Sequence, residues 1–282
     1  MSRRLPVLLY VAALGGCGEP TLLLPPQPVV PPPPATTHFD PSRVGTVTGH
    51  VAWPGELPAA PTYLYGVPDA AGNFTTHTFT GPNQPRIDPD TRAVAGAIVF
   101  LRGVDPAVAR PWDHPPVRVE LVERGIRVRQ GAEVGRVGFV RRGDAVELVS
   151  RDPVYHVLRG RGAAFFSLAL PEREQVRTRT FTDPGRVELS SGAGYYWASA
   201  DLFVTDHPYW TTTDAAGRFT LSGVPAGRVE VVVWHPGWLP ARRDRDPETG
   251  LVTRMTYAPA TEQARPADVP AGGTSDIGVT LP

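Results

Sequence analysis

Residues 204–238 read VTDHPYWTTTDAAGRFTLSGVPAGRVEVVVWHPGW, and this stretch decides the fold of the C-terminal part of the chain. Two short runs of apolar and β-branched residues, 218–221 and 228–234, are separated by a turn that contains Pro and Gly. In the first run Phe219 and Leu221 fall on one face, because strand side chains alternate. Runs of this length between Gly, Pro and Asp turns predict strands.

The same pattern recurs along most of the chain. No stretch of helical length spaces its apolar residues three to four apart, and the 33 prolines disfavour long helices. We therefore predict an all-β fold class, built as two β-sandwiches. The segment 58–92 is rich in Gly, Pro and Thr and is predicted to be a long loop. The other predicted strands are 46–53, 97–101, 117–122, 125–129, 136–140, 145–150, 186–189, 201–204 and 277–281.

One sandwich is suggested by a family resemblance. Residues 213–227, TDAAGRFTLSGVPAG, resemble the core of carboxypeptidase regulatory-like domains. Residues 45–58 (GTVTGHVAWPGELP) and 94–101 (VAGAIVFL) resemble the first two strands of the same domain. The resemblance implies a transthyretin-like, usually non-catalytic sandwich. It also implies that this domain is split, with its first strands near residue 45 and its last ones near residue 280.

The intervening segment resembles a plastocyanin-type cupredoxin. Residues 134–157, VGRVGFVRRGDAVELVSRDPVYHV, follow the strand-turn-strand of that family, and His156 matches its first histidine ligand. Copper-binding members carry Cys, His and Met further on. The resemblance places Gly192, Tyr195 and Ala198 at those positions, so the copper ligands are mostly lost.

The cysteine count makes this loss independent of alignment. A type-1 copper centre needs a thiolate, and the one cysteine of the chain, Cys17, lies far upstream. We expect no metal centre and no cofactor. A weaker alternative is a non-blue Cu(II) or Zn(II) site drawn from His156, His207 and His235, while the other interpretation gives these histidines structural hydrogen bonds.

Other chemistry is sparse. The chain has no Gly-x-Ser-x-Gly, no His-Glu-x-x-His and no phosphate-binding glycine loop, so no catalytic residue is predicted and the protein is not expected to be an enzyme. Turn-forming roles are expected for aspartates such as Asp152. Trp210 and Trp238 are the candidates for ligand contact, for example with a sugar ring.

The distribution of charged residues along the sequence does not indicate binding to nucleic acid. Acidic and basic residues number 28 each, and every basic residue is an arginine. Two arginine clusters, at 159–161 and 242–245, are expected in solvated loops. No nucleic-acid partner is predicted.

The N-terminal residues predict where in the cell the protein is located. Basic residues, a short apolar run and the ending Leu-Gly-Gly-Cys17 have the pattern of a signal peptide and resemble a bacterial lipobox. The apolar run is about half of the roughly 20 residues that a spanning helix needs. The resemblance implies lipidation of Cys17, and Gly18 after it implies the outer membrane. The prolines of residues 25–34 then predict an extended tether.

Together these features predict five segments and a class of function. The segments are a signal peptide (1–16), the lipidated cysteine with a Pro-rich tether (17–43), an N-terminal β segment (44–116), a cupredoxin-like domain (117–205) and a carboxypeptidase regulatory-like domain (206–282). We expect a non-catalytic binding or structural module, lipid-anchored in the bacterial cell envelope. Its partners would be the membrane and an envelope protein or a glycan. The alternatives are metal handling and carbohydrate binding.

Overall fold

The computed structural model describes residues 38–59, 62–68, 73–81, 83–248 and 250–281. The predicted signal peptide, the predicted lipidation site at Cys17 and the proline run of the tether lie outside these residues. The first described element is a single turn of 3-10 helix, η1 (Pro41–Arg43), capped by the Asp40 side chain. Among the described residues, no helix has the length and apolar character to span a membrane.

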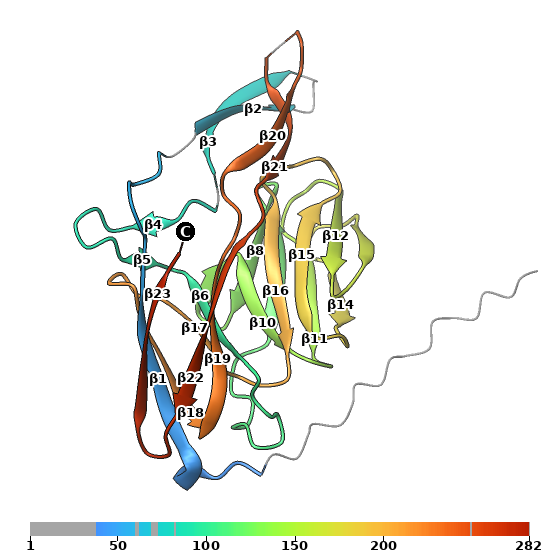
Figure 1. Ribbon diagram of the computed structural model, residues 1–282. Helices are drawn as coiled ribbons and strands as arrows, with labels where there is room; N and C mark the ends of the chain where they lie inside the picture. Colours follow the sequence, from blue (N-terminus) through green and yellow to red (C-terminus); the bar gives the residue numbers. More distant parts are fainter. Residues whose placement is uncertain (1–37, 60–61, 69–72, 82, 249, 282) are drawn as a thin grey trace, which may run out of the picture. The chain divides into compact units, whose positions relative to one another are not determined.

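Strands form two β-sandwiches, so the predicted all-β class is confirmed (Figure 1). The first sandwich has a three-stranded sheet and a four-stranded sheet. The three-stranded sheet consists of β18 (Arg218–Pro225), β1 (Val44–Ala52) and β23 (Thr274–Thr280), in that order. The four-stranded sheet consists of β17 (Trp210–Thr212), β6 (Ile98–Arg102), β19 (Gly227–His235) and β22 (Thr261–Val269).

The first sandwich is assembled from distant parts of the sequence. Strand β1 runs antiparallel to β18 and parallel to β23, so residues near 45, 220 and 277 share one sheet (Figure 1). Its core holds alternate residues of facing strands, such as Val47 of β1 and Val231 of β19. Glycine is required at Gly49, because a Cβ there would approach the carbonyl oxygen of Ile277 to 2.1 Å.

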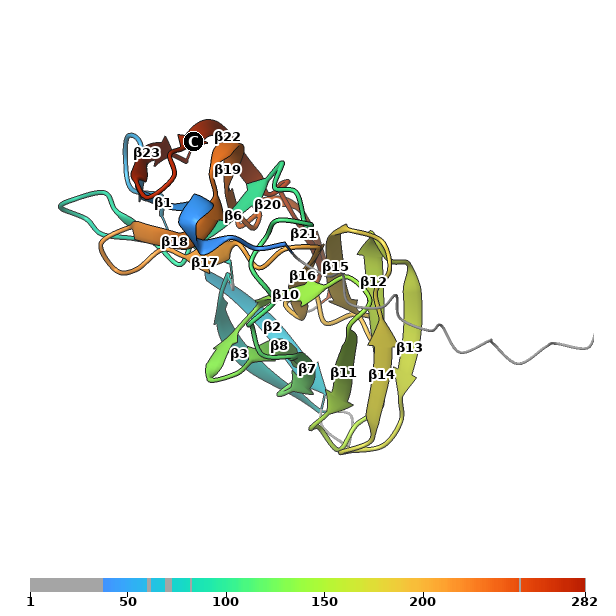
Figure 2. The ribbon, with the colours of Figure 1, turned by 90° about the horizontal axis from the view of Figure 1, so that it is seen from below.

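The second sandwich has two five-stranded sheets (Figure 2). One consists of β10 (Val137–Arg141), β16 (Ser199–Thr205), β15 (Gly185–Ser191), β12 (His156–Gly162) and β13 (Phe166–Leu170). The other consists of β14 (Val176–Thr180), β11 (Ala145–Ser150), β7 (Val117–Val122), β8 (Gly125–Gln130) and β9 (Glu133–Gly135). Its core again uses alternate residues, such as Leu148 and Leu202.

In chain order the second sandwich lies between two parts of the first. Strand β6 precedes it and β17 follows it, and these two strands pair with each other in the first sandwich. Segments 103–116 and 206–209 are the two connections.

The predicted loop at 58–92 is wrong in its middle. It contains a hairpin of β2 (Thr62–Pro68) and β3 (Phe74–Thr80), followed by β4 (Arg86–Ile87), which pairs with β5 (Val94–Ala95). Thr, Tyr and Phe are enriched in these two runs, as β-strands favour. A second hairpin, β20 (Pro240–Arg245) with β21 (Val252–Tyr257), contacts β2.

The prediction that the two arginine clusters lie in loops is also wrong. Arg159 and Arg161 lie on β12, and Arg242, Arg243 and Arg245 lie on β20, so neither cluster is in a loop. Arg159 and Arg161 are two residues apart on β12 and therefore lie on one face of that strand.

Candidate functional site

The positions suggested by the cupredoxin resemblance gather at one corner of the second sandwich. His156 opens β12 and is 1% exposed, and its ring centroid lies 6.2 Å from that of Tyr195. Gly192 donates its backbone N–H to the carbonyl oxygen of Val157 over 2.6 Å. Ala198 is buried in the core that Tyr195 packs against. The corner therefore carries one imidazole where a copper centre would need four ligands.

The His156 imidazole is hydrogen-bonded to a carboxylate of the same sandwich. His156 Nε2 lies 2.9 Å from Asp152 Oδ2. An ionised carboxylate only accepts hydrogen bonds, so Nε2 carries the proton and donates it. The remaining ring atom, Nδ1, is buried and has no hydrogen-bond partner among the described residues.

Asp152 in turn holds the turn between β7 and β8. Its Oδ1 accepts the backbone N–H of Glu123 over 2.7 Å, and its Oδ2 accepts that of Arg124 over 2.8 Å. Glu123 and Arg124 have φ of 53° and 57°, a left-handed conformation that non-glycine residues adopt at some cost. The carboxylate thus fixes a turn in one sheet and a histidine in the other, which is a structural role.

Arg136 is bonded to the loop before β16, where the cupredoxin resemblance aligns Tyr195 and Ala198. One nitrogen of its guanidinium donates to the carbonyl oxygens of Trp197 and Ser199 and lies 2.8 Å from Ser199 Oγ. Burial lowers the pKa of Arg136 to about 10, so it stays charged at neutral pH. The Arg136 guanidinium therefore ties residues 197 and 199 to the start of β10.

The other two candidate histidines do not join His156. His207 lies between β16 and β17 and packs against Tyr209 at 5.6 Å between centroids. His235 ends β19, and its Nδ1 donates to the carbonyl oxygen of Pro236 over 2.9 Å. Burial lowers the pKa of both rings. No group of three or more His, Cys, Asp or Glu side chains able to hold a metal ion occurs in the described part of the chain.

Neither candidate tryptophan presents a free ring. Trp210 stacks on Phe139 with ring centroids 4.2 Å apart and an interplanar angle of 6°. Trp238 is only 8% exposed and meets Trp53 edge-on at 6.3 Å. A sugar needs an exposed aromatic face, which these two residues do not offer.

Trp210 belongs instead to an aromatic cluster that joins the two sandwiches. We call this the junction cluster; it comprises Ile98, Phe100, Phe139, Phe203, Trp210 and Trp234. Phe139 and Phe203 stack at 5.1 Å, and Phe203 meets the edge of Trp234 at 5.1 Å. Phe139 and Phe203 come from the second sandwich, and the other four residues come from the first. The sandwiches therefore share a core.

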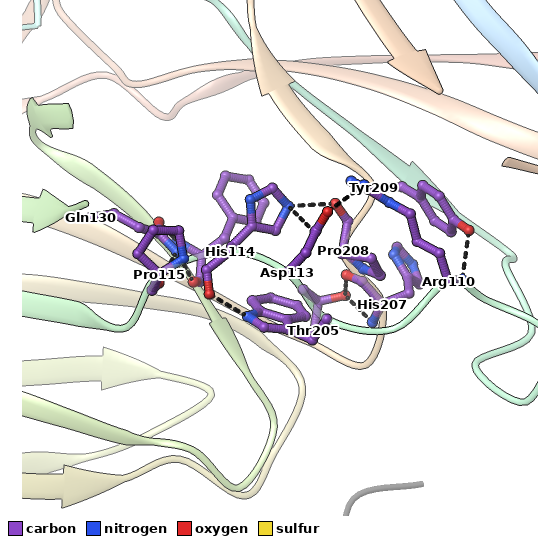
Figure 3. A network of polar contacts seen from close by, with 11 residues as sticks. Arg110, Asp113, His114, Pro115, Gln130, Thr205, His207, Pro208 and Tyr209 are labelled. Atoms are coloured by element: carbon purple, nitrogen blue, oxygen red, sulfur yellow. Dashed lines mark hydrogen bonds and ion pairs between the residues drawn. The ribbon is translucent and has the colours of Figure 1, made fainter. Parts of the chain in front are cut away.

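The two connections between the sandwiches are bonded to each other (Figure 3). His114 Nε2 donates to the carbonyl oxygen of Pro208 over 2.7 Å, and the Tyr209 hydroxyl accepts the backbone N–H of Arg110 over 2.9 Å. The same hydroxyl donates to the carbonyl oxygen of Gly223 over 2.7 Å. Gln130 donates to the carbonyl oxygens of Pro115 and Phe139. This network links the two connections to each other and to β8 and β18.

Two of the cavities in the described structure border the second sandwich. One, of about 670 Å³, is lined by aromatic residues of the cluster, and its cations Arg102 and Arg186 are paired with Glu262 and Asp201 over 2.7 Å. The other, of about 610 Å³, lies between β12, β15 and β16 and the segment from β21 to residue 260. We call the second one the arginine groove, after its residues Arg159, Arg161 and Arg254.

Sequence comparisons find no matching protein-family model and no matching curated protein. Among solved structures, the copper-containing nitrite reductase NirK from Thermus scotoductus SA-01 aligns with 18% identity and a TM-score of 0.28, covering 34% of this chain and 24% of that chain. A purple cupredoxin from Nitrosopumilus maritimus aligns with 11% identity and a TM-score of 0.25, covering 31% of this chain and 98% of that one. A Cu(I) mutant of amicyanin aligns with 17% identity and a TM-score of 0.25, covering 38% and 98%. Likenesses this weak assign no ligand and no activity.

Sequence reasoning missed two polar features. Asp152 was expected only to form a turn, and its bond to His156 is visible in the sequence only as a four-residue spacing. The arginine groove depends on β12, a strand that was not predicted. The alternation Leu158, Arg159, Gly160, Arg161 is the pattern that could have revealed it.

Proposed function

We propose that this chain is a lipid-anchored protein of the bacterial cell envelope whose folded part is a non-catalytic binding module. The observation that carries the proposal is the His156–Asp152 pair, because the one histidine of this corner is bonded to the carboxylate that holds the β7–β8 turn. Gly192 and Ala198 add no donor, and no group of three or more His, Cys, Asp or Glu side chains able to hold a metal ion occurs among the described residues. The residues present there do not fit copper, so a structural role is the better interpretation.

The junction supports a scaffold that holds a ligand site in place. The shared aromatic cluster and the bonded connections fix one sandwich against the other. The arginine groove lies between the second sandwich and the segment from β21 to residue 260. A volume of about 610 Å³ falls in the range of ligand pockets.

Titration of the full chain in detergent with Cu(II) and Zn(II) tests the proposal. We expect no tight stoichiometric binding, and equal weak binding by the parent, His156→Ala and the control His50→Ala, which removes an exposed histidine. One tightly bound equivalent that His156→Ala abolishes and His50→Ala retains would make metal binding the leading function.

The anchor is tested separately. Its support is the Leu-Gly-Gly-Cys17 resemblance and the single cysteine of the chain. Labelling cells with a clickable palmitate analogue should tag the parent and leave Cys17→Ser untagged, with Cys17→Ser leaving the membrane fraction. Equal labelling of both proteins would refute lipidation at Cys17.

A further inference from the structure

The arginine groove holds cations that the protein does not neutralise. Arg159 and Arg161 project from β12, and Arg254 projects from β21 of the β20–β21 hairpin. All three side chains are exposed, and none forms an ion pair or side-chain hydrogen bond with the rest of the described structure. Three unpaired guanidinium groups that line one concave surface favour an anionic ligand.

The groove differs in this respect from the neighbouring cavity. Arg186, which borders both, donates from Nε to Asp201 over 2.7 Å and lies 3.7 Å from Glu188. Asp201 is buried, and burial raises its pKa, with Arg186 opposing that rise. The lining thus carries four arginines against the two acids Glu188 and Asp201, which leaves an excess of two positive charges in the groove.

The groove also offers groups that suit a sugar. Tyr195 contributes a partly exposed ring, and Ser190 and Ser191 contribute hydroxyls from β15. Aromatic faces stack on sugar C–H surfaces, while hydroxyls and amides such as that of Asn83 bond to sugar hydroxyls.

Gly192 lies next to Arg159 of the groove and belongs to the corner that holds His156. A Cβ at Gly192 would lie 3.1 Å from Arg159 Nε and 2.8 Å from Val157 Cβ. The position that carries the copper thiolate in the resembling family is therefore bare here, and the space is used by Arg159.

We propose that the arginine groove binds an acidic polysaccharide through the carboxylates of its sugar units, an inference that rests on the proposed binding function. Guanidinium groups match carboxylates with paired hydrogen bonds.

Affinity electrophoresis of the full chain in detergent tests this assignment, with polygalacturonate in the gel. Fully methyl-esterified polygalacturonate has the same sugars without the charge, and dextran is neutral. We expect polygalacturonate alone to retard the parent. Arg159→Ala/Arg161→Ala should bind at least tenfold more weakly, and Arg254→Ala, from the other wall, should also bind more weakly.

The matched control is Arg177→Ala/Arg228→Ala, which removes two exposed arginines that do not line the groove. It should bind like the parent, and a thermal melt of each variant should show that the fold is kept. Equal loss in both double variants, or no retardation of the parent, would overturn the inference. Binding to dextran or to the esterified polymer that survives Arg159→Ala/Arg161→Ala would also overturn it, while leaving the chain a binding module. Failure of that broader function would show instead in the metal titration.

Discussion

Trp210 of the first sandwich stacks on Phe139 of the second, with their ring centroids 4.2 Å apart and their planes 6° from parallel. The neighbouring strand β6 contributes residues both to the core of the first sandwich and to the junction cluster. Strand β6 buries Val99 and Leu101 in the first core while Ile98 packs into the junction cluster, so its run of apolar residues is covered on both faces. The two sandwiches are therefore parts of one scaffold.

The Asp152 carboxylate should contribute measurably to stability. Replacing it in Asp152→Ala leaves two backbone N–H groups and the His156 ring without an acceptor, so we expect a loss of about 3 kcal/mol in the free energy of unfolding. Asp152→Asn keeps one acceptor oxygen and should lose less. Urea unfolding measures both values. Asp183→Ala, at an exposed position, should change stability by less than about 0.5 kcal/mol, and a similar small change in Asp152→Ala would show that the turn does not need the carboxylate.

Gly192 should not tolerate a side chain. A Cβ there comes within 2.8 Å of Val157, so Gly192→Ala is expected to destabilise the protein by about 1–3 kcal/mol. Displacement of Arg159 should also weaken retardation by polygalacturonate. Gly135→Ala is the control, because a Cβ there has nothing within 4 Å. If Gly192→Ala matches Gly135→Ala in stability and in retardation, the space at residue 192 is not what seats Arg159.

Acid should weaken the fold through two buried histidines. Burial holds the pKa of His207 and of His235 below the 6.5 of an exposed imidazole. Below pH 6.5 the unfolded chain takes up protons that the folded chain refuses, so stability is full above that pH and falls as pH decreases toward the folded pKa values. The slope is at most about 1.4 kcal/mol per pH unit for each ring.

Thermal melts at pH 7.5 and pH 5.5 measure this dependence. His207→Gln and His235→Gln should each flatten it. The buried Asp201, whose raised pKa acts in the opposite sense at acid pH, is shared by all variants and cancels in the difference. Parallel pH profiles for the parent and both variants would contradict the assignment.

How far the sequence predicts this molecule depends on how local the determining contacts are. Strands such as β7 (Val117–Val122) follow from a local β-branched run between turns, and they were predicted correctly. Strand β22 (Thr261–Val269) was missed because it carries Pro266 and several polar residues, as an edge strand can. The exposure of Trp210 could not be predicted, because the ring that covers it lies in another sandwich. For the same reason the arginine groove, which joins β12 to β21, has no continuous sequence pattern.

Differential scanning calorimetry of the full chain tests the central claim that the two sandwiches form one scaffold. The account predicts a single cooperative transition for the parent, with equal calorimetric and van't Hoff enthalpies. Phe139→Ala should lose about 3–5 kcal/mol of stability and split the melt in two, while Val176→Ala, at an exposed site, should melt like the parent. Two resolved transitions in the parent, unchanged by Phe139→Ala, would contradict the account.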